Sequence, residues 1–178
     1  MMQTRITEPF VKISYALWLA SKDAENIHVS VDGAEPEPQQ VLEMLRSQGY
    51  SRTPLAGSKV PWTGNYSLRN HAIRVSCLPG VDVKASMPDG FLVAECKGEP
   101  TEKGIKAGTD RTAFYTGIGQ LLYAAGQMQK VPQHIKVVLP DTLRMRGFAE
   151  EASRNSLLRR LSLGFVLVSR AGTVIEIA

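Results

Sequence analysis

The stretch Gly80-Val-Asp-Val-Lys-Ala-Ser-Met-Pro-Asp-Gly-Phe-Leu-Val-Ala-Glu-Cys-Lys-Gly-Glu99 predicts a β-hairpin. Pro88, Asp89 and Gly90 are its turn signal, because proline presets φ and an Asp-Gly pair tolerates the positive φ of a tight turn. Apolar and polar residues alternate on both sides of the turn. The alternation predicts that Asp82 lies on the first strand and that Glu95 and Lys97 share one face of the second.

Asp82, Glu95 and Lys97 are residues suited to phosphodiester hydrolysis. Two carboxylates can hold Mg²⁺, which also accepts waters and phosphate oxygens in its octahedral coordination. The metal lowers the pKa of a bound water, and an ammonium orients that water or neutralises developing charge. Alternatively, Glu95 and Lys97 are solvated residues of a strand edge. Leu92-Val93-Ala94 is apolar on both faces, which favours a buried central strand, where charges need a partner or a function.

Asp82, followed after twelve residues by Glu95-Cys96-Lys97, resembles the signature of the PD-(D/E)XK nuclease superfamily, which has the restriction-endonuclease-like fold. The resemblance implies that Asp82, Glu95 and the backbone carbonyl of Cys96 bind Mg²⁺ or Mn²⁺. It also implies that Lys97 assists the nucleophilic water.

The chain also contains a literal Pro-Asp pair, Pro88-Asp89. Only five residues intervene between Asp89 and Glu95, and the pair falls within the predicted turn. Asp82 is therefore the expected metal ligand.

The resemblance implies further site residues on helices. Members of the superfamily often place a carboxylate on the helix before the hairpin, and Glu43 is the candidate here; the alternative is a solvated helix face. They also follow the Glu-x-Lys strand with a helix bearing Gln and Tyr near the site. The predicted helix 113–130 offers Gln120, to position Lys97, the water or the DNA backbone, and Tyr123. The usual Gln-x-x-x-Tyr spacing is not met, which places Tyr123 in doubt.

Two polar stretches flank the predicted hairpin. Residues 98–112 form a predicted loop with three basic residues, Lys103, Lys106 and Arg111. These suit phosphate contact near an active site and equally suit a plain solvated loop. Residues 51–66 are rich in turn formers and are either a loop that reaches over substrate or a loop with Trp62 in the core.

The remaining pattern predicts an α/β fold. Helices are expected at 4–22, 39–48, 113–130 and 143–161, and further strands at 27–31, 72–77, 134–139, 164–168 and 173–177. This order predicts an α/β sandwich. From residue 39 onward it matches the core arrangement of the superfamily, so the resemblance implies a restriction-endonuclease-like sandwich, a central mixed β-sheet flanked by helices. We expect a single nuclease-like domain, 1–178, in which 1–38 is an N-terminal helix and strand extension and 39–177 is the core.

Composition limits the class of protein. With 178 residues, 43% of them hydrophobic, the chain can bury one substantial core. A net charge of +4 suits an acidic partner such as nucleic acid without requiring one. Cys77 and Cys96 are expected to be buried, reduced thiols. No segment has the length of a membrane span, and 13–20 suits a helix better than a signal peptide. We therefore expect a cytoplasmic protein.

The leading hypothesis is a Mg²⁺- or Mn²⁺-dependent nuclease that hydrolyses phosphodiester bonds, in DNA above all, as a homodimer or as a subunit of a larger complex. One alternative is a catalytically inactive nucleic-acid-binding or assembly subunit of the same fold. The other is a small α/β domain in which the Asp-Glu-Lys pattern is accidental.

Overall fold

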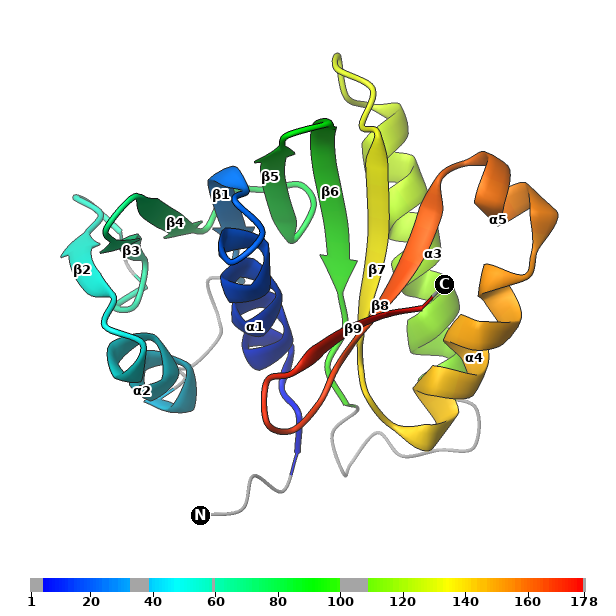
Figure 1. Cartoon of the computed structure of the whole chain (residues 1–178), viewed down its shortest axis with the longest axis horizontal. Helices are drawn as coiled ribbons and strands as arrows, with labels where there is room; N and C mark the ends of the chain where they lie inside the picture. Colours follow the sequence, from blue (N-terminus) through cyan, green and yellow to red (C-terminus); the bar gives the residue numbers. More distant parts are fainter. Residues whose placement is uncertain (1–4, 33–38, 59, 100–108, 178) are drawn as a thin grey trace.

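The computed structural model describes residues 5–32, 39–58, 60–99 and 109–177. Within these residues one mixed nine-stranded sheet has helices on both faces (Figure 1). The helices are α1 (Glu8–Ala20), α2 (Gln39–Ser47), α3 (Thr109–Gly126), α4 (Leu143–Ser153) and α5 (Ser156–Arg160). The strands are β1 (Glu25–Ser30), β2 (Ser51–Pro54), β3 (Gly64–Leu68), β4 (His71–Ser76), β5 (Val83–Met87), β6 (Gly90–Cys96), β7 (His134–Pro140), β8 (Leu163–Val168) and β9 (Val174–Ile177). The predicted α/β class with a central mixed sheet is confirmed.

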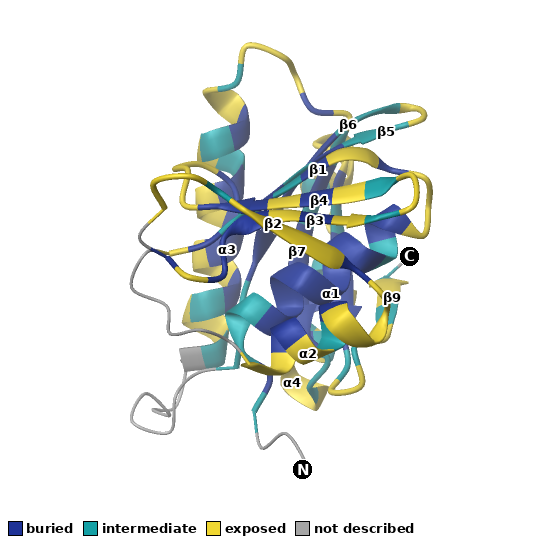
Figure 2. Ribbon diagram, turned by 90° about the vertical axis from the view of Figure 1, so that its left-hand side faces the viewer, coloured by how far each residue is buried: buried dark blue, intermediate teal, exposed yellow. Residues whose placement is uncertain are grey.

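Helix α1 lies at the centre of one face of the sheet. Thr7 caps it, since its hydroxyl accepts the backbone N–H of Phe10 at 3.4 Å. The helix is buried almost all round (Figure 2), because α2 and the turn between β8 and β9 cover the side that faces away from the sheet. Lys12 lies in the middle of this buried helix with a side chain that is only 3% exposed.

The opposite face of the sheet is covered only in part. Helix α3 packs on β6 and β7, and α4 and α5 pack on β8. Side chains alternate between the two layers, so that Val93 contacts the α3 side while Ala94 faces α1. Strands β1, β3, β4 and β5 also turn alternate side chains to this face, and there these are exposed or half-buried.

The order β2-β3-β4-β1-β5-β6-β7-β8-β9 brings distant segments of the chain to one edge of the sheet. Strands β5 and β6 are an antiparallel hairpin closed by the pair Met87 and Gly90, so β5 begins where β6 ends. Strand β1 is antiparallel to β5 and ends at the same place, where Ser30 N–H donates to the Asp82 carbonyl at 2.7 Å. The edge therefore collects residues from the starts and ends of three adjacent strands.

Two expectations about chain organisation are wrong. Strand β1 lies between β4 and β5, and α1 packs on it, so the N-terminal helix and strand belong to the central layers and are not an extension of a core at 39–177. The predicted helix 143–161 is two helices, because Asn155 interrupts it and caps α5 with its side-chain oxygen.

The structure shows which of three residues, Trp62, Cys77 and Cys96, are buried. Trp62 is fully buried and belongs to the core. The expectation that 51–66 is a loop is wrong, because the stretch contains β2 and the start of β3. Cys96 is buried as expected, whereas Cys77 is exposed, because it lies just beyond the end of β4. No helix in the described ranges is long and apolar enough to cross a membrane.

Candidate active site

A cavity of about 410 Å³ lies at the edge where β1 and β6 end and β5 begins. Its walls come from α1, the segments after β1 and β4, the β5–β6 hairpin, and α3. The charged and amide side chains that line it are Glu8, Lys12, Asp32, Asp82, Glu95, Lys97 and Gln120. The cavity thus brings together four residues that the sequence analysis identified as site candidates: Asp82, Glu95, Lys97 and Gln120.

Asp82 is held by one group from strand β6 and one from helix α1. Its Oδ2 accepts the backbone N–H of Cys96 at 2.8 Å, and its Oδ1 lies 2.8 Å from Lys12 Nζ. The same ammonium lies 2.9 Å from Glu8 Oε1, one helical turn earlier on α1. Lys12 therefore joins two carboxylates, one from the helix and one from the hairpin.

Lys97 occupies the corresponding position beside Glu95. Its Nζ lies 2.8 Å from Glu95 Oε1 and 2.8 Å from Gln120 Oε1, which places the lysine between the end of β6 and helix α3. The side chains of Glu95 and Lys97 are 10% and 16% exposed. Two bonds to oxygen fix the ammonium but leave a third donor position on Nζ.

Burial controls the ionisation of both carboxylates. Burial raises the pKa of Asp82, and the neighbouring Lys12 only partly opposes this. Burial also raises the pKa of Glu95, and the charge of Asp82 raises it further. The two carboxylates are therefore close enough to repel each other, and a cation between them would relieve that repulsion.

The two lysines keep their protons. Burial alone would lower the pKa of Lys12, but Asp82 and Glu8 outweigh it and hold the pKa well above its ordinary value. Burial likewise opposes the charge of Lys97, and the bond to Glu95 outweighs it, so the pKa of Lys97 is also raised. Both side chains are cations at neutral pH, and Lys97 is not a proton acceptor there.

Gly98 allows a close approach between two segments of the site. A Cβ on Gly98 would lie 2.5 Å from the backbone nitrogen of Glu8, so only glycine lets the chain after Lys97 run against the start of α1. A Cβ on Gly117 would lie 3.4 Å from Lys97 Cε, an ordinary van der Waals contact, so the lysine stem passes close to α3 but does not require glycine there.

The donor set suits a hard divalent cation. Among the described residues no three His, Cys, Asp or Glu side chains form a metal-binding group. Mg²⁺, however, often binds one or two carboxylates and completes its octahedron with waters and phosphate oxygens. Asp82 and Glu95 supply two such carboxylates with raised pKa values. The residues present therefore fit one Mg²⁺ or Mn²⁺, provided that Lys12 shares Asp82 or moves from it.

Other predicted site residues lie apart from the cavity or outside the described residues. Glu43 is exposed on α2 and is not among the lining residues, so that prediction is not supported by the structure. Tyr123 is 74% exposed and lines a neighbouring hollow together with Glu95 and Gln120. The guanidinium of Arg111 lies over the Phe148 ring between α3 and α4. Lys103 and Lys106 are outside the described residues.

Sequence reasoning missed Glu8 and Lys12. The signal was present, because Lys12 is the one cation in the apolar run Phe10-Val-Lys-Ile-Ser-Tyr-Ala-Leu17. A charge in a helix that is apolar all round requires a buried partner, and Glu8 stands at the i−4 position. The carboxylate that a helix contributes to the site is thus Glu8 on α1.

The chain matches no protein-family model, no curated protein and no solved structure. The residues and geometry of this cavity are therefore the basis on which a function can be proposed.

Proposed function

We propose that this chain is a metal-dependent nuclease with a restriction-endonuclease-like arrangement, and that its substrate is DNA. The observation that carries the proposal is the position of Lys97 Nζ, 2.8 Å from both Glu95 Oε1 and Gln120 Oε1, in a cavity that also contains Asp82. An accidental Asp-Glu-Lys pattern gives no reason for these side chains to converge. Their convergence supports the resemblance on which the prediction rested.

Asp82 and Glu95 would hold the metal, with the Cys96 carbonyl as the third protein ligand. When bound, such a cation polarises a phosphate oxygen and lowers the pKa of a water. The protein's part is to hold two carboxylates together in one cavity, each with a lysine ammonium at 2.8 Å. The bond from the Cys96 N–H to Asp82 Oδ2 fixes one of them.

Lys97 acts as a fixed positive charge. Because its pKa is raised, it cannot remove a proton from water at neutral pH. It can donate a hydrogen bond to the attacking water or to a phosphate oxygen, and so stabilise charge that develops in the transition state. Gln120 accepts from the same ammonium and holds it in that orientation.

A second candidate is a nucleic-acid-binding or assembly subunit without catalysis. The observation that favours it is Lys12, whose ammonium already neutralises Asp82 at 2.8 Å. If Lys12 holds Asp82 permanently, the metal has one carboxylate fewer.

The test compares the wild type with Lys97→Ala on supercoiled plasmid, linear duplex and single-stranded DNA, each with Mg²⁺, Mn²⁺ or EDTA. We expect metal-dependent cleavage that is lost in Lys97→Ala and retained in Lys136→Ala. Lys136 is a matched control, because it is also a strand lysine with a carboxylate partner, Glu176 at 3.0 Å, outside the cavity. Absence of cleavage by the wild type on every substrate favours the second candidate.

A further inference from the structure

A row of polar and basic side chains crosses the uncovered face of the sheet. The strand register places Asn65 opposite Arg74, Arg74 beside His28, and His28 opposite Lys84. Because paired residues in adjacent strands point to the same face, these four side chains stand side by side on β3, β4, β1 and β5. With strands about 4.8 Å apart, the row is roughly 14 Å long, and Arg74 and Lys84 are about 10 Å apart.

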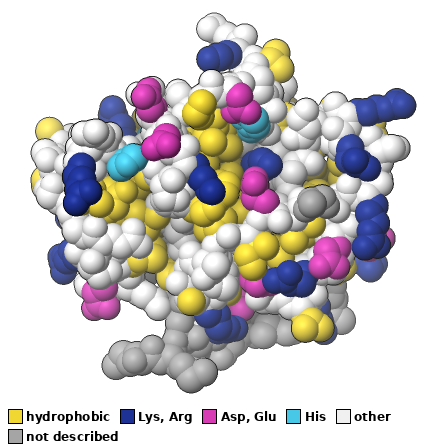
Figure 3. Space-filling model, in the orientation of Figure 1, with side chains coloured by type: hydrophobic (Ala, Val, Ile, Leu, Met, Phe, Trp, Pro, Cys, Tyr) yellow, Lys and Arg dark blue, Asp and Glu magenta, His cyan; other side chains and the backbone are white. Residues whose placement is uncertain are grey.

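The cations of this row have no counter-ion among the described residues. His28 Nε2 lies 2.6 Å from Ser76 Oγ, and neither Arg74 nor Lys84 has an ion pair or hydrogen bond within the described part of the chain. By contrast, Lys, Arg, Asp and Glu side chains are interspersed on the face that Figure 3 shows. An uncompensated set of cations is suited to an anionic ligand.

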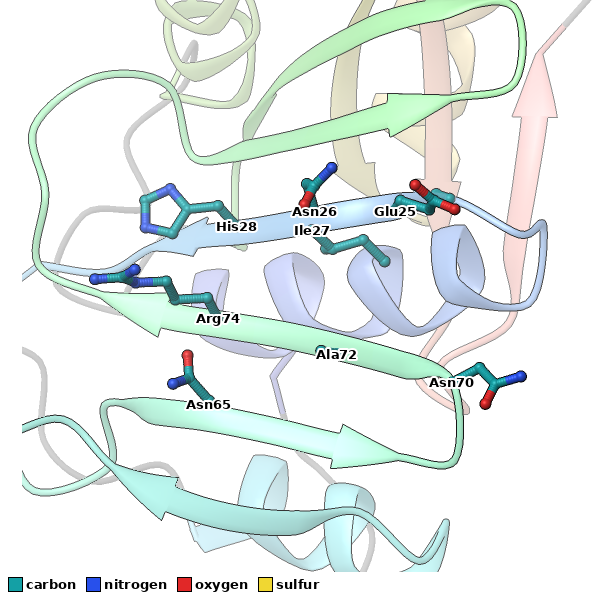
Figure 4. Close-up of a pocket in the computed structure, with 9 residues that line it drawn as sticks. Glu25, Asn26, Ile27, His28, Asn65, Asn70, Ala72 and Arg74 are labelled. Atoms are coloured by element: carbon teal, nitrogen blue, oxygen red, sulfur yellow. The ribbon is translucent and has the colours of Figure 1, made fainter.

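The surface between these residues is hollow. A cavity of about 450 Å³ is lined by His28, Arg74, Asn65 and the short side chain of Ala72. Figure 4 shows Arg74 and His28 at the same end of their strands, with the Asn65 amide directed toward Arg74. The carboxylate in the lining, Glu25, lies at the other end of β1 (Figure 4). Guanidinium, imidazole and amide groups are those that bind phosphate oxygens.

The row ends at the candidate active site. Lys84 lines a hollow that it shares with Glu95 and Gln120. The loop residue Gly80 joins this hollow to the cavity of Asp82, since it lines both. A nucleic-acid strand bound along the row would therefore extend toward Asp82 and Glu95.

We propose that Asn65, Arg74, His28 and Lys84 form a track that binds the phosphate backbone of duplex DNA and leads it to the candidate active site. The proposal rests on the proposed nucleic-acid substrate but not on cleavage. The row carries no Phe, Tyr or Trp, so it suits backbone contact and not the stacking of unpaired bases. It therefore assigns duplex DNA as the ligand.

Binding of a short fluorescein-labelled duplex tests the track by anisotropy over a range of salt concentrations. All proteins carry Lys97→Ala, so that the probe stays intact, and the row variant adds Arg74→Ala with Lys84→Ala. Losing two phosphate contacts is expected to weaken binding and to reduce the slope of log K against log salt by about 1.8. The control adds Lys22→Ala with Arg46→Ala, which removes the same charge at positions outside the row: Lys22 lies just beyond the end of α1, and Arg46 lies on α2. The control should leave the slope unchanged.

A second measurement follows His28 by NMR. Burial lowers the pKa of His28, and the charges of Lys84 and Arg74 lower it further. A phosphate bound among these groups is expected to raise the pKa of His28, whereas DNA bound elsewhere leaves it unchanged.

The outcomes separate the track from the catalytic proposal. Equal slopes for the row variant and the control, in folded proteins, overturn the track even if the wild type cleaves DNA. Absence of any salt-dependent binding to duplex DNA also overturns it. If the wild type does not cleave DNA but the row variant loses binding, the track is supported and only the nuclease is rejected.

Discussion

Lys12 Nζ lies 2.8 Å from Asp82 Oδ1, although Lys12 belongs to helix α1 and Asp82 immediately precedes strand β5, seventy residues later in the sequence. The contact places a permanent positive charge on one of the two proposed metal ligands. Lys12 is thus either a cation that shares the carboxylate with the metal or one that replaces the metal.

Replacement of Lys12 distinguishes these roles. We expect Lys12→Met to lower the free energy of unfolding by about 3 kcal/mol in EDTA, because it leaves Asp82 as an unpaired carboxylate in a largely buried position. Mg²⁺ should restore part of this loss, since the metal then takes the place of the ammonium. Denaturant unfolding with and without Mg²⁺ measures both effects. Equal stability of the variant and wild type in EDTA would contradict the assignment.

Metal binding should depend on Asp82 and not on Asp89. We expect Mg²⁺ to raise the Tm of the wild type and of Asp89→Asn, but not that of Asp82→Asn. Asp89 is a strict control, because it lies in the hairpin turn, at the opposite end of β6 from Glu95, where its carboxylate is bonded to His134. A Tm shift that disappears in Asp89→Asn instead would place the metal at the other end of the hairpin.

The raised pKa of Glu95 has a predictable effect on stability. The folded protein binds the Glu95 proton more tightly than the unfolded chain, whose pKa is near 4.5. Ionisation therefore disfavours folding, and the wild type should lose stability relative to Glu95→Gln as the pH rises from below 4.5 through the folded-state pKa. Unfolding in EDTA across this pH range measures the difference. A constant difference across this range would contradict a raised pKa of Glu95 in the folded protein.

Gln120 is predicted to be a positioning residue that acts through Lys97. Gln120→Ala should lower kcat roughly 10- to 100-fold with a smaller change in KM, because the ammonium loses one of its two fixed oxygens. Gln120→Glu keeps a side-chain oxygen for Lys97 and should recover much of the rate. Gln127→Ala, one of the residues on the wall of the neighbouring hollow, is the control. An equal loss in both alanine variants would indicate a general effect on this wall and not positioning.

The elements with strong local signals could be predicted from the sequence. The Asp89-Gly90 turn and the alternation beside it predicted the β5–β6 hairpin, and the structure contains it. That pairing in turn places Asp82 near Glu95, because two antiparallel strands fix the register between their ends. Gln120 was expected from the resemblance to the superfamily, and the packing of α3 on β6 brings it to Lys97.

What the sequence did not reveal depends on long-range packing. Strand β1 pairs with β4 and β5, which follow it by more than forty residues, and no local pattern encodes that choice. Glu43 was the expected carboxylate because the resemblance implies one on the helix that precedes the hairpin, whereas Glu8 lies on the first helix of the chain. Only the position of α1 against the sheet shows which carboxylate reaches the cavity.

The insertion of β1 between two later strands also affects how the chain folds as it is synthesised. At 5–20 residues per second, β1 precedes the start of β4 at the ribosome by roughly 2–8 seconds. During that time both of its hydrogen-bonding edges lack their native partners, and the apolar side of α1 has no sheet to cover. The nascent protein is thus most exposed to mispairing and to chaperones before residue 87 has emerged, at a stage when Asp82 has not yet paired with Lys12.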